Sequence, residues 1–394
     1  MTLKHFWRGV AATVKREMRR FTDDAEYRAV AWWMPLGVIL FFALFFSYEV
    51  VGALPVAVVD EDNTSLSRKV VSMIRATPQT SLVNEFSDME SARAEMLQGG
   101  VVAVVEIPEG FAKNLLSGEG AEVLLYDSGT NISANSLSAK GIQTAVSTFD
   151  VGVALKRAAM EGAMPEEAMA QIVPIAFSTY ALFNPWLNYA YSVGPCFWVM
   201  ILIIAAMLST IYSVGSELRY ATSVEWLRTA NCSLMGGLIG KLAPITLLLW
   251  VLVLVVGVMI FGVFGAPMRG SWIVLVAGAV ALVMAYQAVA LFVVALTASF
   301  RLSLSLGGGY SVLAFTFSGI TFPTMAMFST IQPFTMLFPY TYFMRLYIDQ
   351  AVRGTEWWLS MLDIAAMLLF CLLPLLAMGR LKRISVNRKF WGRL

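Results

Sequence analysis

Long uncharged stretches of apolar residues follow one another along this chain and predict membrane-spanning helices. A span needs about 20 mostly apolar residues, and six segments provide them: 29–48, 192–214, 243–264, 273–298, 303–322 and 357–379. Pro323, Pro333 and Pro339 interrupt the apolar segment that follows the fifth span. Because proline breaks a helix, we expect 323–348 to form short re-entrant helices at the outer side, where surrounding protein shields their backbone.

The composition supports a membrane protein. Hydrophobic residues make up 58% of the 394 residues and charged residues 14%, whereas soluble domains average about 45–50% and about 25%. Three separated cysteines and one histidine form no disulfide framework and no spacing of metal ligands. We therefore predict a polytopic α-helical membrane protein with six transmembrane helices and re-entrant helices after the fifth. The first transmembrane segment is assigned to 29–52 and the other five, with a basic tail, to 191–394.

Lysine and arginine are distributed unevenly and predict the orientation of the chain. Seven basic residues precede the first span and six follow the last, and the loops after the second and fourth spans are also basic. With six spans, all of these fall on one side, and such an excess marks the cytoplasmic side. We expect both termini in the cytoplasm, with the chain in a bacterial inner membrane. No cleavage site follows the basic N-terminal segment, so we expect no cleaved signal peptide.

Residues 53–190, between the first two spans, have the pattern of an inserted α/β domain outside the cytoplasm. Apolar runs predict strands at 55–60, 101–107 and 121–127, and helical periods cover 65–76 and 133–162. Sixteen acidic and eight basic residues give this segment a net charge of −8. Because nucleic acid attracts basic surfaces, this charge argues against a nucleic-acid partner.

The acidic segment Asp60-Glu61-Asp62-Asn63 has two interpretations. Its oxygen-rich side chains could form a calcium loop, but the spaced ligands and distal glutamate of such a loop are absent. A solvated turn between a strand and a helix explains the same residues, and we favour it.

Two further segments are expected in the cytoplasm. Residues 1–28 contain an amphipathic helix, predicted over 3–21, with apolar residues at three- and four-residue steps and four basic residues on the other face. Such a helix lies in the headgroup layer, and it can also contact a cytoplasmic partner. Residues 217–230 are predicted to form a short polar helix between the second and third spans.

Several motifs in the chain point to a family. The loop after the second span carries Glu217, Ser223, Glu225, Leu227, Gly240 and Lys241. Further motifs lie at 56–70, 101–131, 183–185 (FNP) and 318–349. In this order they resemble the ABC type 2 exporter permeases, specifically those with a large domain between the first two spans. That family has glycine where this chain has Thr222, and Thr-Pro where it has Ala230-Asn231, so this copy is divergent.

The resemblance implies partners. Such exporters work as two permeases, identical or paralogous, with two ATP-binding subunits. The sequence has no loop similar to GxxxxGK[ST], so we expect no cofactor and no enzyme activity here, with ATP and Mg²⁺ on the partner. Gly307-Gly308-Gly309 lacks the lysine and fits helix packing instead. Glu217, Glu225 and Arg228 are implied to contact the ATP-binding subunit; the alternative is that they are solvated loop charges.

The resemblance also implies a substrate path between the two permeases, lined by the second and fifth spans. Candidate lining residues are Phe197, Met200, Met207, Phe315 and Phe317. These surfaces suit hydrophobic or amphiphilic cargo, drug-like or lipid-like, although packing or lipid contact is the alternative for each. Charged residues inside spans usually mark ion pathways, and here they lie only near the ends of the spans. The sequence therefore favours an externally powered efflux pump.

Three alternatives remain open. A six-span secretion component or surface receptor of the same superfamily would have a longer outside region with coiled-coil heptads, and 53–190 shows none. A membrane enzyme would need serine-lysine chemistry, with Lys140 and one of Ser128, Ser133, Ser136 or Ser138. Finally, the outside domain could dock a periplasmic adaptor protein in addition to any transport role.

Overall fold

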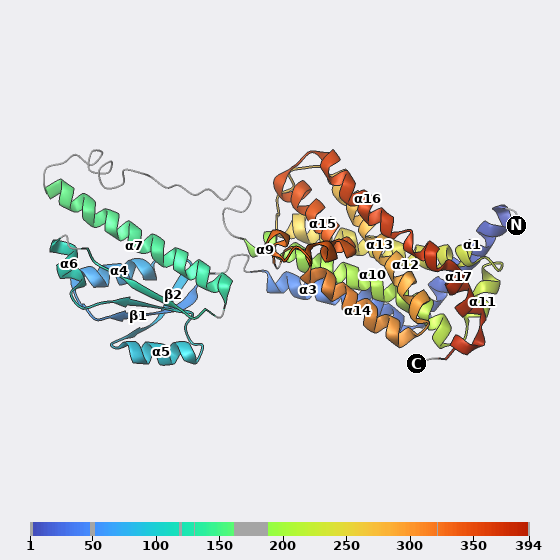
Figure 1. Ribbon diagram of the computed structural model, residues 1–394, viewed down its shortest axis with the longest axis horizontal. Helices are drawn as coiled ribbons and strands as arrows, with labels where there is room; N and C mark the ends of the chain where they lie inside the picture. Colours follow the sequence, from blue (N-terminus) through green and yellow to red (C-terminus); the bar gives the residue numbers. More distant parts are fainter. Residues whose placement is uncertain are drawn as a thin grey trace. The chain divides into compact units, whose positions relative to one another are not determined.

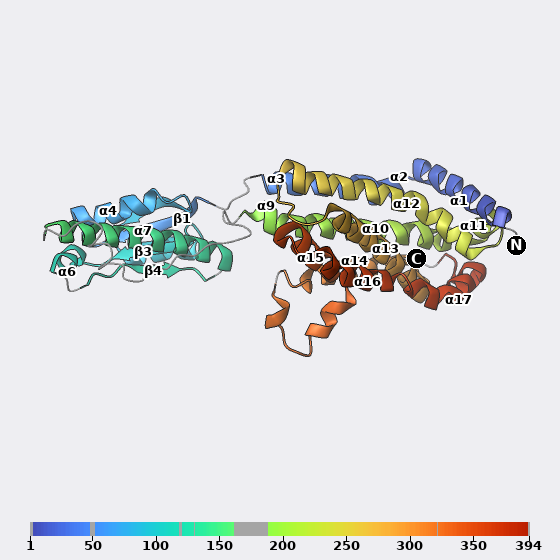
Figure 2. The ribbon, with the colours of Figure 1, turned by 90° about the horizontal axis from the view of Figure 1, so that it is seen from above.

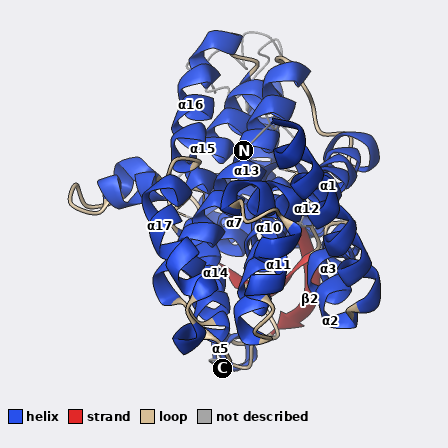
Figure 3. Cartoon of the chain, turned by 90° about the vertical axis from the view of Figure 1, so that its right-hand side faces the viewer, coloured by secondary structure: helices blue, strands red, loops and turns tan. Residues whose placement is uncertain are grey.

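The computed structural model describes residues 3–47, 52–117, 120–129, 131–160, 188–320 and 322–392. The chain divides into two compact units, one of residues 1–49 and 182–394 and the other of residues 50–181. The first unit is helical, and the strands that the structure describes all lie in the second (Figures 1 and 3). The C-terminal part of the predicted 53–190 domain, 161–187 with its FNP motif, lies outside the described residues.

The smaller unit is built on a four-stranded sheet. Its strands, in the spatial order β2-β1-β3-β4, are β2 (Thr80–Phe86), β1 (Leu54–Asp60), β3 (Ala103–Ile107) and β4 (Leu124–Asp127). The strand β1 pairs in parallel with β2 and β3, and β4 is antiparallel to β3. Four helices accompany the sheet: α4 (Ser65–Arg75), α5 (Met89–Leu97), α6 (Phe111–Ser117) and α7 (Ile132–Met160).

Both faces of this sheet are covered by helices (Figure 1). Side chains alternate along a strand, so Val56 and Val58 pack beneath α4 and α7 while Ala57 and Val59 pack on α5. The predicted strands and helices are therefore present. The strand β2 and the helix α5 were not predicted. In β2, an edge strand, polar and exposed residues leave no apolar run that would mark it as a strand.

The segment after β1 is a turn, as favoured from the sequence. The Asp60 carboxylate accepts hydrogen bonds from Asn63 N (3.0 Å) and Ser67 Oγ (2.7 Å). Asp62 accepts one from Ala112 N (3.2 Å). The carboxylate oxygens of Asp60 and Asp62 thus hold the turn in place by hydrogen bonds. The described residues contain no cluster of three or more histidine, cysteine or acidic side chains suited to a metal ion.

Among the described residues, five helices are long and apolar enough to cross a membrane. They are Ala25–Phe45, Ala190–Arg219, Leu234–Val263, Trp272–Thr297 and Trp357–Val386. In order, they consist of α2 (Ala25–Arg28), η1 (Ala29–Trp33) and α3 (Met34–Phe45); α9 (Tyr189–Ser192) and α10 (Gly194–Arg219); α12 (Leu234–Gly257) and η2 (Val258–Val263); α13 (Trp272–Thr297); and η6 (Trp357–Ser360), α16 (Met361–Phe370) and α17 (Leu373–Val386). Five of the six predicted spans therefore coincide with such helices, and the chain is a multi-pass membrane protein.

The predicted fifth span, 303–322, corresponds to the shorter helix α14 (Phe300–Thr316). At 1.5 Å per residue its 17 residues reach about 26 Å, against a hydrocarbon core of about 30 Å. The six-span count thus stays a prediction. The following segment forms short helices: η3 (Thr324–Ala326), η4 (Gln332–Leu337), α15 (Pro339–Tyr347) and η5 (Ile348–Arg353). Their re-entrant position at the outer side of the membrane stays a prediction.

The core of the larger unit lies around α10 and α13, which are mostly buried, whereas a much smaller share of α12 and of α16 with α17 is buried (Figure 2). Gly307 of α14 allows the close packing of α14 on α10. A Cβ atom at this position would lie 2.5 Å from Ile211 Cδ1. The expectation of a packing role is therefore confirmed for Gly307, whereas Gly308 and Gly309 face open space.

Candidate functional site

The helix α1 (Leu3–Asp23) confirms the amphipathic helix expected near the N-terminus, and it packs closely on α12. Glycines make this approach possible. A Cβ atom at Gly240 of α12 would lie 2.5 Å from Thr13 Cβ, and one at Gly9 of α1 would lie 2.8 Å from Ala230 O. Small residues at such crossings let backbones come together. As a result, the face of α1 that carries Gly9 and Thr13 packs directly on the helical unit.

The packed face of α1 carries a buried acid. Glu17 is only 1% exposed, and its carboxylate accepts hydrogen bonds from Lys241 Nζ (2.7 Å), Ser213 Oγ (2.6 Å) and Tyr27 Oη (2.9 Å). Lys241, in α12, is fully buried. Each charge thus has an opposite charge and further hydrogen bonds, which is the condition for keeping charges in an apolar interior.

Lys241 also links Glu17 to a second buried acid, Glu217 in α10. The Lys241 Nζ atom lies 2.8 Å from Glu217 Oε1. Arg16 binds both carboxylate oxygens of Glu217, at 2.6 and 3.1 Å, and Arg20 Nη1 lies 3.1 Å from Oε1. Burial lowers the pKa of Arg16, but its hydrogen bonds with Glu217 and the charge of that carboxylate outweigh burial and raise it.

These five side chains form one charged cluster, which we call the five-charge cluster: Arg16, Glu17, Arg20, Glu217 and Lys241. They come from three helices, α1, α10 and α12. The two carboxylates lie between three cations, so moving any of the helices away would leave a buried charge without its partner. Because that is costly, the cluster couples the positions of the three helices.

The predicted polar helix at 217–230 requires a correction. The helix α10 continues to Arg219, and α11 (Ser223–Thr229) begins only after a turn. Ala221 in this turn has φ +58°, a left-handed conformation that ends the first helix. Glu217 therefore belongs to α10 and is fully buried. Its carboxylate is not available for direct contact with another subunit, whereas Glu225 and Arg228 of α11 are exposed.

The opposite side of α11 is attached to the five-charge cluster. Trp226 is buried, donates from Nε1 to Gly237 O (3.2 Å), and lies with its ring 5.4 Å from Lys241 Nζ. Ser223 Oγ donates to Glu217 O (3.0 Å), and the Thr222 hydroxyl donates to the Glu217 carboxylate. The short helix thus has one face free for a partner and one face bonded to α10 and α12.

A transporter family model matches most of this chain. Its description is ABC-2 family transporter protein, and the match covers residues 28–380. The chain belongs to this family. A search of curated proteins found no match. Membership supports the role of a membrane subunit of an ABC exporter and implies a partnership with an ATP-binding cassette subunit.

In this ABC-2 family transporter protein, the residues predicted to line a substrate path lie in different surroundings. Phe197 and Phe315 are half-buried, and their rings lie 5.1 Å apart. Phe317 lies 5.1 Å from the ring of Phe334. Met207 is fully buried beneath Gly307, so it packs α10 on α14.

Met200 is half-buried and packs at the edge of the helical core. The structure therefore brings Phe197 and Phe315 together from the second and fifth predicted spans. A path along these residues stays a prediction for this ABC-2 family transporter protein.

The sequence did not reveal that Arg16, Glu17 and Arg20 are functional candidates. The amphipathic pattern placed the arginines on a solvated face, and Lys241 was assigned to a loop. A signal was present nonetheless, since Lys241 stands only two residues before the long apolar segment 243–264. A charge so close to a span needs a partner, but which residue supplies it depends on helix packing.

Proposed function

We propose that this chain is the permease of an ABC exporter that moves a hydrophobic or amphiphilic compound outward. A separate ATP-binding subunit docks on α11 and supplies the energy. The observation that carries this proposal is the two-sided attachment of α11. Its outer face exposes Glu225 and Arg228, and its inner face is bonded to the buried five-charge cluster.

The geometry supports a route for mechanical coupling. Movement of α11 is passed through Trp226, Ser223 and Thr222 to Glu217 and Lys241, and so to α10 and α12. The helix α10 carries Phe197 and Met200 of the proposed path. In this scheme Glu217 positions the helices rather than touching the partner, and α1 forms a second contact with the ATP-binding subunit.

The cargo and the further partners follow from the same scheme. Two permeases, identical or paralogous, face each other across the path, and its aromatic and methionine side chains suit drug-like or lipid-like molecules. The acidic α/β domain (net charge −8 over 53–190) lies outside the inner membrane and is a candidate to dock a periplasmic adaptor. ATP and Mg²⁺ bind on the partner subunit.

Copurification of the ATP-binding subunit tests the proposal. The tagged chain is purified in mild detergent as wild type, Glu225→Arg, Arg228→Glu and, as a control, Glu90→Arg in the α/β domain. We expect the ATPase subunit to copurify with wild type and control, and its affinity to fall about tenfold, or about 1.4 kcal/mol, in each α11 variant.

Two results would contradict the proposal. If wild type purifies without any ATP-binding subunit while it still binds an outside ligand, the chain is a receptor or secretion component. If the subunit copurifies equally with all four proteins, the ATPase does not dock on α11.

A further inference from the structure

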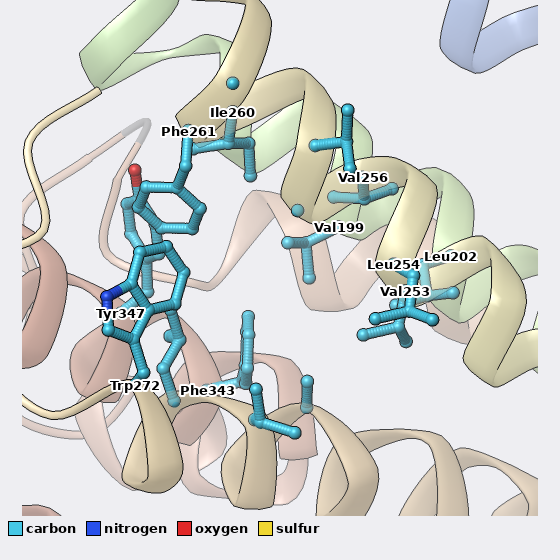
Figure 4. A pocket seen from close by; sticks show the side chains of 16 residues that line it. Val199, Leu202, Val253, Leu254, Val256, Ile260, Phe261, Trp272, Phe343 and Tyr347 are labelled. Atoms are coloured by element: carbon cyan, nitrogen blue, oxygen red, sulfur yellow. The ribbon is translucent and has the colours of Figure 1, made fainter. Parts of the chain in front are cut away.

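A cavity of about 480 Å³ lies in the membrane-spanning unit, between α10, α12, η2, α13 and α15. Its lining is hydrocarbon apart from the Tyr347 hydroxyl and the Trp272 indole nitrogen. Figure 4 shows aromatic side chains, Phe261, Trp272 and Tyr347, at one end and aliphatic ones, among them Val253 and Leu254, at the other. We call this cavity the lateral groove.

The lateral groove opens toward the bilayer. Its rim residues Leu254, Val258 and Trp272 are 65%, 60% and 52% exposed, and they lie on helices that are long and apolar enough to cross the membrane. In the helix formed by α12 and η2, only 28% of the apolar stretch is buried inside the protein. In a bilayer, the medium at this opening is therefore lipid rather than water.

Two features of the chain create the hollow. The π-helix η2 interrupts the helix after Gly257, and such wide turns are common at functional sites. Within this turn, Phe261 packs edge-on against Trp272, with ring centroids 4.6 Å apart. Gly257 leaves its part of the wall unfilled, because a Cβ atom there would meet nothing within 4 Å.

The aromatic end of the lateral groove offers polar atoms. The Tyr347 hydroxyl is buried and has no hydrogen-bond partner among the described residues. Tyr347 also lines a second cavity, of about 290 Å³, together with Tyr191, Ser192 and Cys196. Buried hydroxyls normally find an acceptor, but this one is closed off from the groove as it stands. Trp272, which is 52% exposed, is therefore the side chain at this end that an ester group of a lipid can reach.

We propose that the lateral groove binds one acyl chain of a bilayer phospholipid, with the ester region at the Trp272 and Tyr347 end. An apolar cavity does not hold ordered water, and its volume is in the range of small-molecule sites. Tryptophan and tyrosine are typical of the level where acyl chains meet headgroups. A flexible acyl chain can enter this hollow and fill it along its length. This lipid site does not rest on the proposed function.

Photo-crosslinking of the full-length chain tests this site. The protein is placed in nanodiscs containing phosphatidylcholine with a diazirine halfway along one acyl chain, and the adducts are located by mass spectrometry. We expect adducts on Val253 and Val276 of the lateral groove to exceed those on Leu247 and Ile273. The latter two are exposed residues of the same helices that do not line it.

Gly257→Leu fills the lateral groove, and Gly37→Leu is its matched control, since a Cβ atom at Gly37 also meets nothing within 4 Å. We expect groove adducts to fall about tenfold, or about 1.4 kcal/mol, in Gly257→Leu and to stay unchanged in Gly37→Leu. Equal labelling of groove and non-groove residues in wild type would overturn the proposal. So would adducts that persist in a folded Gly257→Leu variant, or crosslinks between two copies at the groove in place of lipid adducts.

Discussion

Lys241 is the residue on which the five-charge cluster depends. Its ammonium group contacts both Glu17 and Glu217, and all three side chains are at most 1% exposed. Of the two buried carboxylates, Arg16 and Arg20 form salt bridges with that of Glu217. Without Lys241, Glu17 would keep hydrogen bonds from Ser213 and Tyr27 but no cation at salt-bridge distance among the described residues.

We expect Lys241→Met to destabilise the protein strongly. Removal of one partner from a buried ion pair costs about 3–5 kcal/mol, because the remaining charge stays desolvated. The measurement is thermal unfolding of the detergent-solubilised protein, followed by tryptophan fluorescence, with a clearly lower midpoint expected for the variant. Lys382→Met, at an exposed position of α17, should change the free energy of unfolding by no more than about 0.5 kcal/mol.

A second variant separates charge from packing in this experiment. If the loss arises from an unpaired carboxylate, Lys241→Met combined with Glu17→Gln should recover part of the stability, as a double-mutant cycle would measure. Equal midpoints for wild type and Lys241→Met would show that the five-charge cluster contributes nothing to stability.

At the scale of elements, the contact between α1 and α12 decides how the N-terminal segment behaves. An amphipathic helix alone would lie free in the headgroup layer. Here Gly9 and Gly240 bring α1 against the helical unit, and its exposed side keeps the apolar residues Leu3, Trp7 and Met18 for lipid. The same helix thus packs on protein along one face and offers another to the membrane.

We predict that Gly240→Val displaces α1. Its Cβ atom would lie 2.5 Å from Thr13 Cβ and 2.9 Å from Val10 O, a backbone atom that cannot rotate away. Overpacking of this kind costs about 1–3 kcal/mol. Hydrogen exchange measured by mass spectrometry should accelerate across α1, whereas Gly308→Val, which faces open space, should leave it unchanged. Unaltered exchange in Gly240→Val would mean that α1 is not held by this crossing.

At the scale of the whole molecule, orientation in the membrane follows from charge. The basic segments at both ends and after the second span predict that they lie in the cytoplasm, with the acidic α/β domain on the other side. The structure supplies reporters for this prediction. Cys232, just after α11, is exposed, whereas Cys196 is buried.

Labelling with a membrane-impermeant maleimide should therefore depend on the side of addition. In a Cys371→Ser background, we expect Cys232 to react in inside-out vesicles and to stay unlabelled in right-side-out ones. Lys69→Cys, at an exposed position of α4, should give the reverse pattern. Reaction of Cys232 in right-side-out vesicles would invert the topology and place α11 out of reach of a cytoplasmic ATPase.

Elements whose cause is local could be predicted from the order of residues alone. Apolar length predicted five spans, short apolar runs predicted three strands of the sheet, and proline spacing predicted the short helices after α14. The ordered motifs along the chain, at 56–70, 101–131, 183–185, 217–241 and 318–349, pointed to the family that the match over 28–380 establishes. Each of these depends on residues close together in the chain, so a pattern along the sequence suffices.

Which charges meet depends on how the helices pack in the folded protein. Glu17 and Lys241 are 224 residues apart, and Arg16 and Glu217 are 201 apart. No pattern along the sequence indicates such a pairing. From the sequence alone, each of these charged residues looks the same as one exposed to water. The lateral groove likewise arises where α10, α12, α13 and α15 pack against each other. Burial is a property of packed helices, and it turned apparent loop charges into the buried connection between α1, α10 and α12.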